Sequence, residues 1–144
     1  MLSKTIVDFC TSNGWWFDDA SADYAAELRK LDIDPDSECA TFYLHADDGP
    51  TFNQGGDEIY QLCWFSKYTN YDLALKRTHD TLQLPVTYLP LCSFEGGNGY
   101  FYDRADGSVV RVSLGGAGST PGALEIAPKW PTFSAFLEAY FGLS

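Results

Sequence analysis

The sequence lacks the features that mark a membrane segment or an export signal. No stretch approaches the roughly 20 apolar residues that span a bilayer, and runs such as residues 62–65 are only a few residues long. Near the N-terminus, Asp8 occupies a position where a signal peptide would need its apolar stretch. We therefore expect a cytoplasmic protein that does not bind a membrane.

Cysteine is present but never in the close pairs that typify zinc sites. The four cysteines lie about 25 to 30 residues apart, and no C-x-x-C occurs. A disulfide framework is not expected without an export signal. Each cysteine has apolar neighbours, which favours a small buried apolar side chain. We expect no metal and no other cofactor, and burial of Cys10, Cys39, Cys63 and Cys92.

Residues suited to catalysis are scarce or scattered. There are two histidines. His45 lies near Asp47 and Asp48 without a spacing that matches a known site, and His79 lies among charged residues typical of a solvated helix face. The glycine-rich residues 95–99 precede a strand-like run, whereas a phosphate loop needs a helix behind it. We expect no catalytic residues and a protein that is not an enzyme, although a carboxylate pair of hydrolase type stays open.

Basic residues are few, and the charge is unevenly distributed. The net charge is −11. Residues 1–58 hold 13 acidic and 3 basic residues, whereas residues 59–144 hold 7 acidic and 6 basic ones. Such a chain repels phosphate backbones and anionic membranes, which argues against direct nucleic-acid binding. A cationic protein is the partner that this charge favours.

The acidic residues of the first two fifths of the chain form the candidate partner-binding face. Trp15 or Trp16 is the candidate anchor, because tryptophan is enriched at binding hot spots. Adjacent side chains point in different directions, so we expect at least one ring of the run 15–17 in the core. The candidate acids are Asp18, Asp19, Asp23, Asp34, Asp36, Glu38, Asp47, Asp48, Asp57 and Glu58.

Hydrophobic spacing and turn residues predict helices first, then strands, then a closing helix. Asp34 and Pro35 have the types of a helix cap and first helical residue, and Asp106 followed by Gly107 is a strong hairpin signal. The order indicates an α+β fold with one domain over residues 1–144. The predicted helices are one ending at residues 13–14, then 22–31, 34 to about 47, 71–82 and the amphipathic 132–141; the predicted strands are 59–65, 88–94, 100–103 and 108–114, with a loop at 115–122.

Several segments together resemble the SUKH superfamily of Smi/Knr-like proteins, which includes many immunity proteins of bacterial polymorphic toxin systems. The family pattern is an apolar strand, a glycine-rich turn, an aromatic strand ending in Asp, a G-x-V strand and a C-terminal helix with spaced aromatics. The chain departs from it at Asp34, where the family often has Leu, and at Asp47–Asp48–Gly49 in place of Asn-Gly-Gly. The matching segments are 33–35, 42–43, 49–52, 88–103, 107–110 and 132–137.

The resemblance implies a twisted mixed or antiparallel sheet flanked by helices. It also implies an immunity protein that binds and neutralises a cognate toxin protein, expected to be basic and often a nuclease or another enzyme acting on nucleic acid. The family is not catalytic. Two alternatives stay open: a regulatory or scaffolding module with a host partner, and a small carboxylate-based hydrolase. The sequence leaves open a monomer or a homodimer.

Overall fold

A computed structural model describes residues 1–114 and 124–143, with Glu95 described by its backbone alone. The α-helices are α1 (Lys4–Ser12), α2 (Ala22–Lys30), α3 (Glu38–His45), α4 (Leu62–Tyr68), α5 (Tyr71–Lys76) and α6 (Phe133–Tyr140). A π-helical turn η1 (Arg77–Thr81) extends α5, and a 3-10 turn η2 (Glu95–Gly97) precedes β4. The strands are β1 (Thr51–Gln54), β2 (Asp57–Tyr60), β3 (Tyr88–Pro90), β4 (Asn98–Asp103), β5 (Val109–Leu114) and β6 (Leu124–Trp130).

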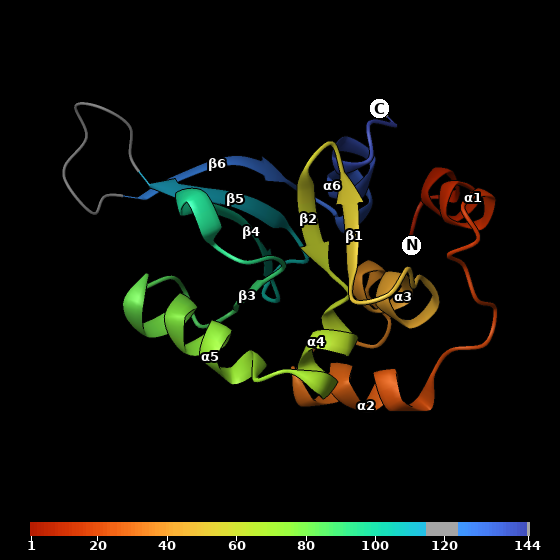
Figure 1. Cartoon of the computed structure of the whole chain (residues 1–144), viewed down its shortest axis with the longest axis horizontal. Coiled ribbons are helices and arrows are strands. Elements are labelled where there is room, and N and C mark those ends of the chain that lie inside the picture. The colour runs from red at the N-terminus through yellow and green to blue at the C-terminus, as the bar shows by residue number, and fades with distance from the viewer. Residues whose placement is uncertain (115–123, 144) are drawn as a thin grey trace.

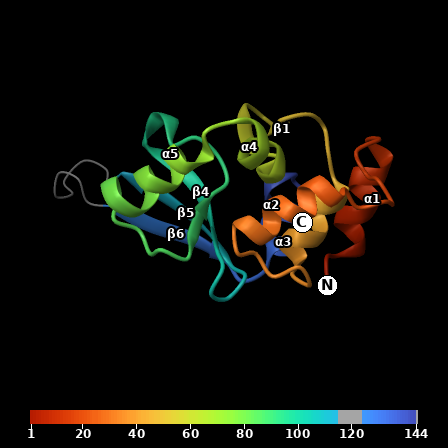
Figure 2. The same ribbon diagram turned by 90° about the horizontal axis from the view of Figure 1, so that it is seen from below.

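The elements form two regions that meet at α6 and the β1–β2 hairpin. Helices α1, α2 and α3 gather at one end, and the four-stranded sheet lies at the other (Figure 1). That sheet has the order β3-β4-β5-β6, and every pairing in both sheets is antiparallel. Helix α5 runs along the sheet on the side seen from below (Figure 2). The predicted α+β fold with a C-terminal helix is confirmed.

Short hydroxyl side chains begin four of the helices. Ser3, Ser21, Ser37 and Thr132 each accept a hydrogen bond from the backbone N–H three residues further on. This bond satisfies one of the N–H groups that a helix start leaves without a partner. The helices predicted at 22–31 and 132–141 begin at Ala22 and Phe133, each directly after its cap residue.

The start predicted for the third helix is wrong. The side chain of Asp34 accepts a hydrogen bond from the Asp36 N–H, and its carbonyl accepts one from the Ser37 hydroxyl. These bonds close a turn over residues 34–37. The helix therefore begins at Glu38, capped by Ser37, and Asp36 lies outside it.

The apolar run at residues 59–65 is not a strand. Strand β2 ends at Tyr60, and Gln61 caps α4, so the run is divided between two elements. The strand predicted at 88–94 is shorter, since β3 ends at Pro90. The hairpin at Asp106 and Gly107 is confirmed between β4 and β5. The loop predicted at 115–122 lies outside the described residues.

Two apolar clusters cover the faces of the four-stranded sheet. On one face Phe133 and Phe136 of α6 contact the rings of Tyr102 and Tyr100. On the other face Phe101, Val110 and Val112 pack with Leu84 and Phe94. The sheet thus lies between α6 and the segment that follows η1.

The prediction that the cysteines are buried is confirmed for three of them. Cys10, Cys39 and Cys63 are fully buried, and Cys92 is half-buried. Burial raises the pKa of Cys10 and of Cys92 to about 11. It also raises the pKa of Cys63 to about 12. Within the described chain, no helix has the length and apolar character to cross a bilayer.

The core contains a tyrosine whose hydroxyl has no hydrogen-bond partner among the described residues. Tyr43 is fully buried, whereas the hydroxyl of the buried Tyr71 donates to the Pro90 carbonyl at 2.6 Å. We expect Tyr43→Phe to keep or raise the free energy of unfolding by up to about 1 kcal/mol, because it removes an unsatisfied buried group. Tyr71→Phe is expected to lower it by about 1–2 kcal/mol.

Urea unfolding of both variants tests this contrast, since each removes one oxygen from a buried tyrosine. A loss in Tyr43→Phe as large as that in Tyr71→Phe would contradict the prediction, because it would show that the Tyr43 hydroxyl is bonded in solution.

Candidate functional site

The aromatic run at residues 15–17 lies along the end of α3. The Phe17 N–H donates to the His45 carbonyl, and the Asp47 N–H donates to the Trp15 carbonyl. This pairing turns successive rings to different sides. The half-buried Trp15 packs against the core residue Phe52. Trp16 stacks on the imidazole of His45, with ring centroids 5.1 Å apart.

Beside this segment lies a hollow that we call the acidic groove, with a volume of about 360 Å³. Its walls come from the turn before α2, the first turn of α2, the end of α3 and the last turn of α4. The carboxylates in it belong to Asp19, Asp23 and Asp47. The groove is also lined by Phe17, Tyr24, His45, Lys67 and Tyr68.

One of these carboxylates already binds a cation of the same chain. The Lys67 ammonium lies 2.7 Å from the Asp23 carboxylate. The hydrogen bond from Lys67 lowers the pKa of Asp23, and the reciprocal bond raises the pKa of Lys67. Both groups are largely solvated, so the pair contributes little to stability. It shows that an ammonium group is accommodated here.

Asp47 is held in a fixed orientation. Its Oδ2 accepts a hydrogen bond from the Tyr24 hydroxyl at 3.1 Å, and its Oδ1 accepts one from the Gly49 N–H at 2.9 Å. Burial first, and then the charge of Asp47, raise the pKa of Tyr24, so its hydroxyl stays a donor. A carboxylate fixed in this way loses little side-chain freedom when it meets a cation.

Exposed aromatic rings border the groove. Phe17 is 52% exposed and Tyr68 is 60% exposed, which are high values for large apolar residues. The Nδ1 of His45 lies 2.7 Å from the Phe17 carbonyl oxygen, so this nitrogen carries the proton. Carboxylates flanked by such rings are suited to bind a guanidinium or ammonium group, which is attracted to both.

The structure divides the predicted acidic face. Asp19, Asp23 and Asp47 come together in the acidic groove, and Asp18 and Asp48 adjoin it in sequence and are exposed. The other candidates lie elsewhere. They are Asp34 and Asp36 in the turn before α3, Glu38 at the start of α3, the half-buried Trp15 packed against the core, and Asp57 and Glu58 on β2.

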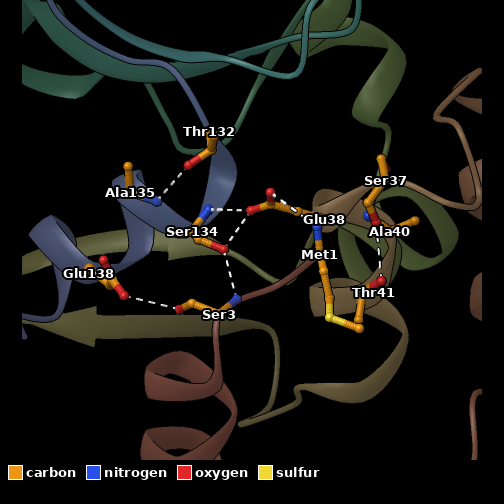
Figure 3. Close-up of polar contacts among 10 residues, drawn as sticks. All are labelled: Met1, Ser3, Ser37, Glu38, Ala40, Thr41, Thr132, Ser134, Ala135 and Glu138. Atoms are coloured by element: carbon orange, nitrogen blue, oxygen red, sulfur yellow. Dashed lines mark hydrogen bonds and ion pairs between the residues drawn. The ribbon is translucent and has the colours of Figure 1, made fainter.

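Glu38 faces inward and holds α6 in place. Its Oε1 accepts hydrogen bonds from both the N–H and the hydroxyl of Ser134, and the N–H bond is 2.9 Å long. Ser134 in turn accepts from the Ser3 N–H, and the Ser3 hydroxyl donates to Glu138 (Figure 3). This chain of bonds joins the N-terminal segment, α3 and α6, so Glu38 positions helices in this structure.

Sequence reasoning missed Lys67 and Tyr68 as neighbours of the acids. Both lie on α4. This helix was not predicted, because residues 59–65 were predicted to form a strand. A lysine and an aromatic at consecutive positions carry no local signal for a site, because their meaning depends on α2 lying beside α4. His45 is a partly exposed residue at the end of α3.

Comparisons of the chain with protein-family models, with curated proteins and with solved structures find no match.

Proposed function

We propose that this chain is an immunity protein. It binds a cationic toxin domain of the kind that acts on nucleic acid, and this binding blocks the activity of the toxin. The observation that carries the proposal is the acidic groove, where Asp19, Asp23 and Asp47 converge beside the exposed rings of Phe17 and Tyr68. Enzymes that grip nucleic acid carry cationic surfaces. Carboxylates on a rigid inhibitor can occupy the positions of the nucleic-acid phosphates, as in the inhibition of barnase by barstar.

The charge distribution supports rapid binding of such a partner. Nearly all of the net charge of −11 arises from residues 1–58, which contribute −10. These residues include α1, α2 and α3, which gather at one end of the molecule (Figure 1). A charge concentrated in this way steers a cationic protein toward that end and raises the association rate. The resemblance to SUKH immunity proteins points to the same class of partner.

Binding fits the groove better than carboxylate-based hydrolysis. A general acid of that type needs a carboxyl group whose pKa is raised by its surroundings. In the acidic groove Lys67 lowers the pKa of Asp23 instead. The groove is also shallow enough to leave Phe17 and Tyr68 more than half exposed.

Reversing charge in the acidic groove is expected to slow toxin binding. In Asp19→Lys/Asp23→Lys, two carboxylates become ammonium groups, so the association rate should fall by about tenfold or more and depend less on salt. The matched control is Asp36→Lys/Asp80→Lys, which changes the net charge equally at two exposed positions outside the groove. Its association rate should fall several-fold less.

The measurement has two stages. The tagged wild-type protein and both variants capture proteins from a lysate of the producing organism at low salt, and a salt gradient elutes them. A basic polypeptide held by the wild type and the control, but lost by the groove variant, is then expressed with each of them. Immunity requires that the wild type and the control rescue growth and that the groove variant does not. Capture of a non-toxic host protein, or rescue by the groove variant, would overturn the proposal.

A further inference from the structure

Two adjoining hollows lie on the sheet side of the molecule, and neither shares a described lining residue with the acidic groove. The apolar hollow has a volume of about 220 Å³ and lies between α5, η1 and the sheet. The polar hollow has a volume of about 320 Å³ and lies between the start of β2 and the start of β4. Cys92 and Ser93 line both hollows, so the two adjoin, and we call them together the two-part groove.

The apolar part has the size of one side chain. Leu82, Phe94 and Phe101 line it, and Leu73 at its rim is 64% exposed. A cavity of roughly 150 Å³ accommodates benzene, so the apolar hollow accommodates one aliphatic or aromatic side chain. Arg77 closes one side, where its guanidinium carbon lies 5.3 Å from the ring centroid of Phe94 and one N–H donates to the Phe94 carbonyl. A solvent-accessible leucine beside an apolar hollow is typical of a binding surface.

The polar part is anionic. Asp57 and Glu58 line it, and both are exposed. Neither makes an ion pair with any residue that the structure describes. The Tyr100 hydroxyl donates to the Asp57 carboxylate at 3.4 Å, which places that oxygen at the wall of the hollow. The residue that divides the two parts is uncharged, because burial holds the pKa of the Cys92 thiol near 11.

The backbone of β2 presents an open edge to the polar part. The Tyr60 N–H points away from β1 and donates to the Leu91 carbonyl at 2.7 Å. Backbone groups of an antiparallel strand point to the same side at every second residue. The N–H and C=O of Glu58 therefore point toward the polar hollow, where an extended chain can pair with them.

We propose that the two-part groove binds an extended segment of a partner polypeptide in which an apolar residue is followed or preceded, two positions away, by lysine or arginine. Side chains two residues apart on an extended chain lie on the same face, roughly 7 Å apart. The apolar side chain enters the apolar hollow, the cation meets Asp57 and Glu58, and the segment's backbone pairs with Glu58. This site is independent of the acidic groove and of the toxin proposed to bind there.

The probe is the blocked peptide acetyl-Lys-Thr-Leu-Thr-Lys-amide, which offers a cation two positions from leucine in either chain direction. It is titrated into the full chain at low salt, and amide chemical shifts are followed by NMR. We expect saturable shifts at Glu58, Ser93 and α5. Replacing the peptide's leucine by glycine should weaken binding by about tenfold or more, because the apolar contact is lost. Replacing both peptide lysines by glutamate should abolish binding.

Two exposed protein positions complete the test. Leu73→Ser should lower the affinity for the leucine peptide but leave the weak binding of the glycine peptide unchanged. Glu58→Gln should lower the affinity for both peptides by about two- to fivefold. The control Asp36→Asn, at an exposed acid outside the groove, should change neither affinity. The proposal is overturned by the absence of saturable shifts, by shifts confined to the acidic groove, or by equal affinity of the leucine peptide for Leu73→Ser, Glu58→Gln and the wild type. Each result is obtained without a toxin, so it is separate from the fate of the immunity proposal.

Discussion

Replacing Gln61 by leucine is expected to lower the free energy of unfolding by about 3–4 kcal/mol. Gln61 is fully buried between α3 and α4. Its amide nitrogen donates to the carbonyls of Tyr43 and Ala46 at 3.0 and 2.8 Å. Its amide oxygen accepts from the N–H groups of Cys63 and Trp64. Leucine is of similar size, so the loss comes from buried groups left unpaired and not from a cavity.

Urea unfolding measures this loss, and two further variants identify its cause. Gln54→Leu makes the same substitution at the exposed last residue of β1 and should change the free energy of unfolding by less than about 0.5 kcal/mol. Gln61→Glu in its ionised form keeps the acceptor for Cys63 and Trp64 but loses the donor to the two carbonyls. A loss below about 1 kcal/mol in Gln61→Leu would show that water replaces the amide.

The Gln61→Glu variant also has a predictable pH dependence. Burial beside two carbonyls raises the pKa of the new carboxyl group in the folded state above its unfolded value of about 4.3. The protonated form can donate a hydrogen bond, so the variant is most stable below that value. Its stability relative to the wild type should then fall as the pH rises through the folded-state pKa.

The second large effect is expected at Arg104, which follows β4. Its guanidinium donates to the carbonyls of Leu31, Val86 and Thr87, at 2.7 Å for Leu31 and 3.2 Å for Thr87. These bonds join the end of α2 to the segment before β3, so one side chain connects the helical region to the sheet. Arg104→Lys should lower the free energy of unfolding by about 2–3 kcal/mol, because an ammonium group cannot reach the three carbonyls together.

Hydrogen exchange distinguishes this connection from a general loss of stability. Amides near Leu31 and Val86 should exchange faster in Arg104→Lys than the change in global stability accounts for, because the two regions separate locally. The control is Arg111→Lys, an exposed position on β5 that should leave exchange unchanged. Uniform acceleration across the chain, or none at all, would contradict a local connection by Arg104.

Local signals in the sequence were sufficient where one residue fixes one element. Ser21 and Thr132 mark helix starts, and the pair at 106–107 marks the hairpin, because cap and turn chemistry act within four residues. The strand predicted at residues 59–65 was wrong for the opposite reason. Their apolar spacing suits a strand, but Gln61 follows the end of β2 and caps α4 with its amide oxygen. Its amide nitrogen is held by two carbonyls at the end of α3, which is distant in sequence. Strand β6 was not predicted. It contains Pro128 and lies at the edge of the sheet, where a strand tolerates proline.

The same limit of local sequence signals applied to the candidate site. Composition located the acidic residues in the first two fifths of the chain, but it could not say which of them share a surface. That depends on α4 lying against α2, which brings Lys67 to Asp23, and on Glu38 turning toward Ser134 instead of solvent. Asp57 and Glu58 belong to a different groove because β2 lies beside β4 and not beside α2.

The buried thiols make the chain a reporter of its own opening. Alkylating reagents attack the thiolate, and burial holds the pKa of Cys10 and Cys92 near 11 and that of Cys63 near 12. At neutral pH the fully buried Cys10, Cys39 and Cys63 therefore need a fluctuation that exposes them before they can be labelled, whereas the half-buried Cys92 is partly accessible from the start. The labelling rates of the three buried thiols in the unmodified protein then give the frequencies at which α1, α3 and α4 open to solvent.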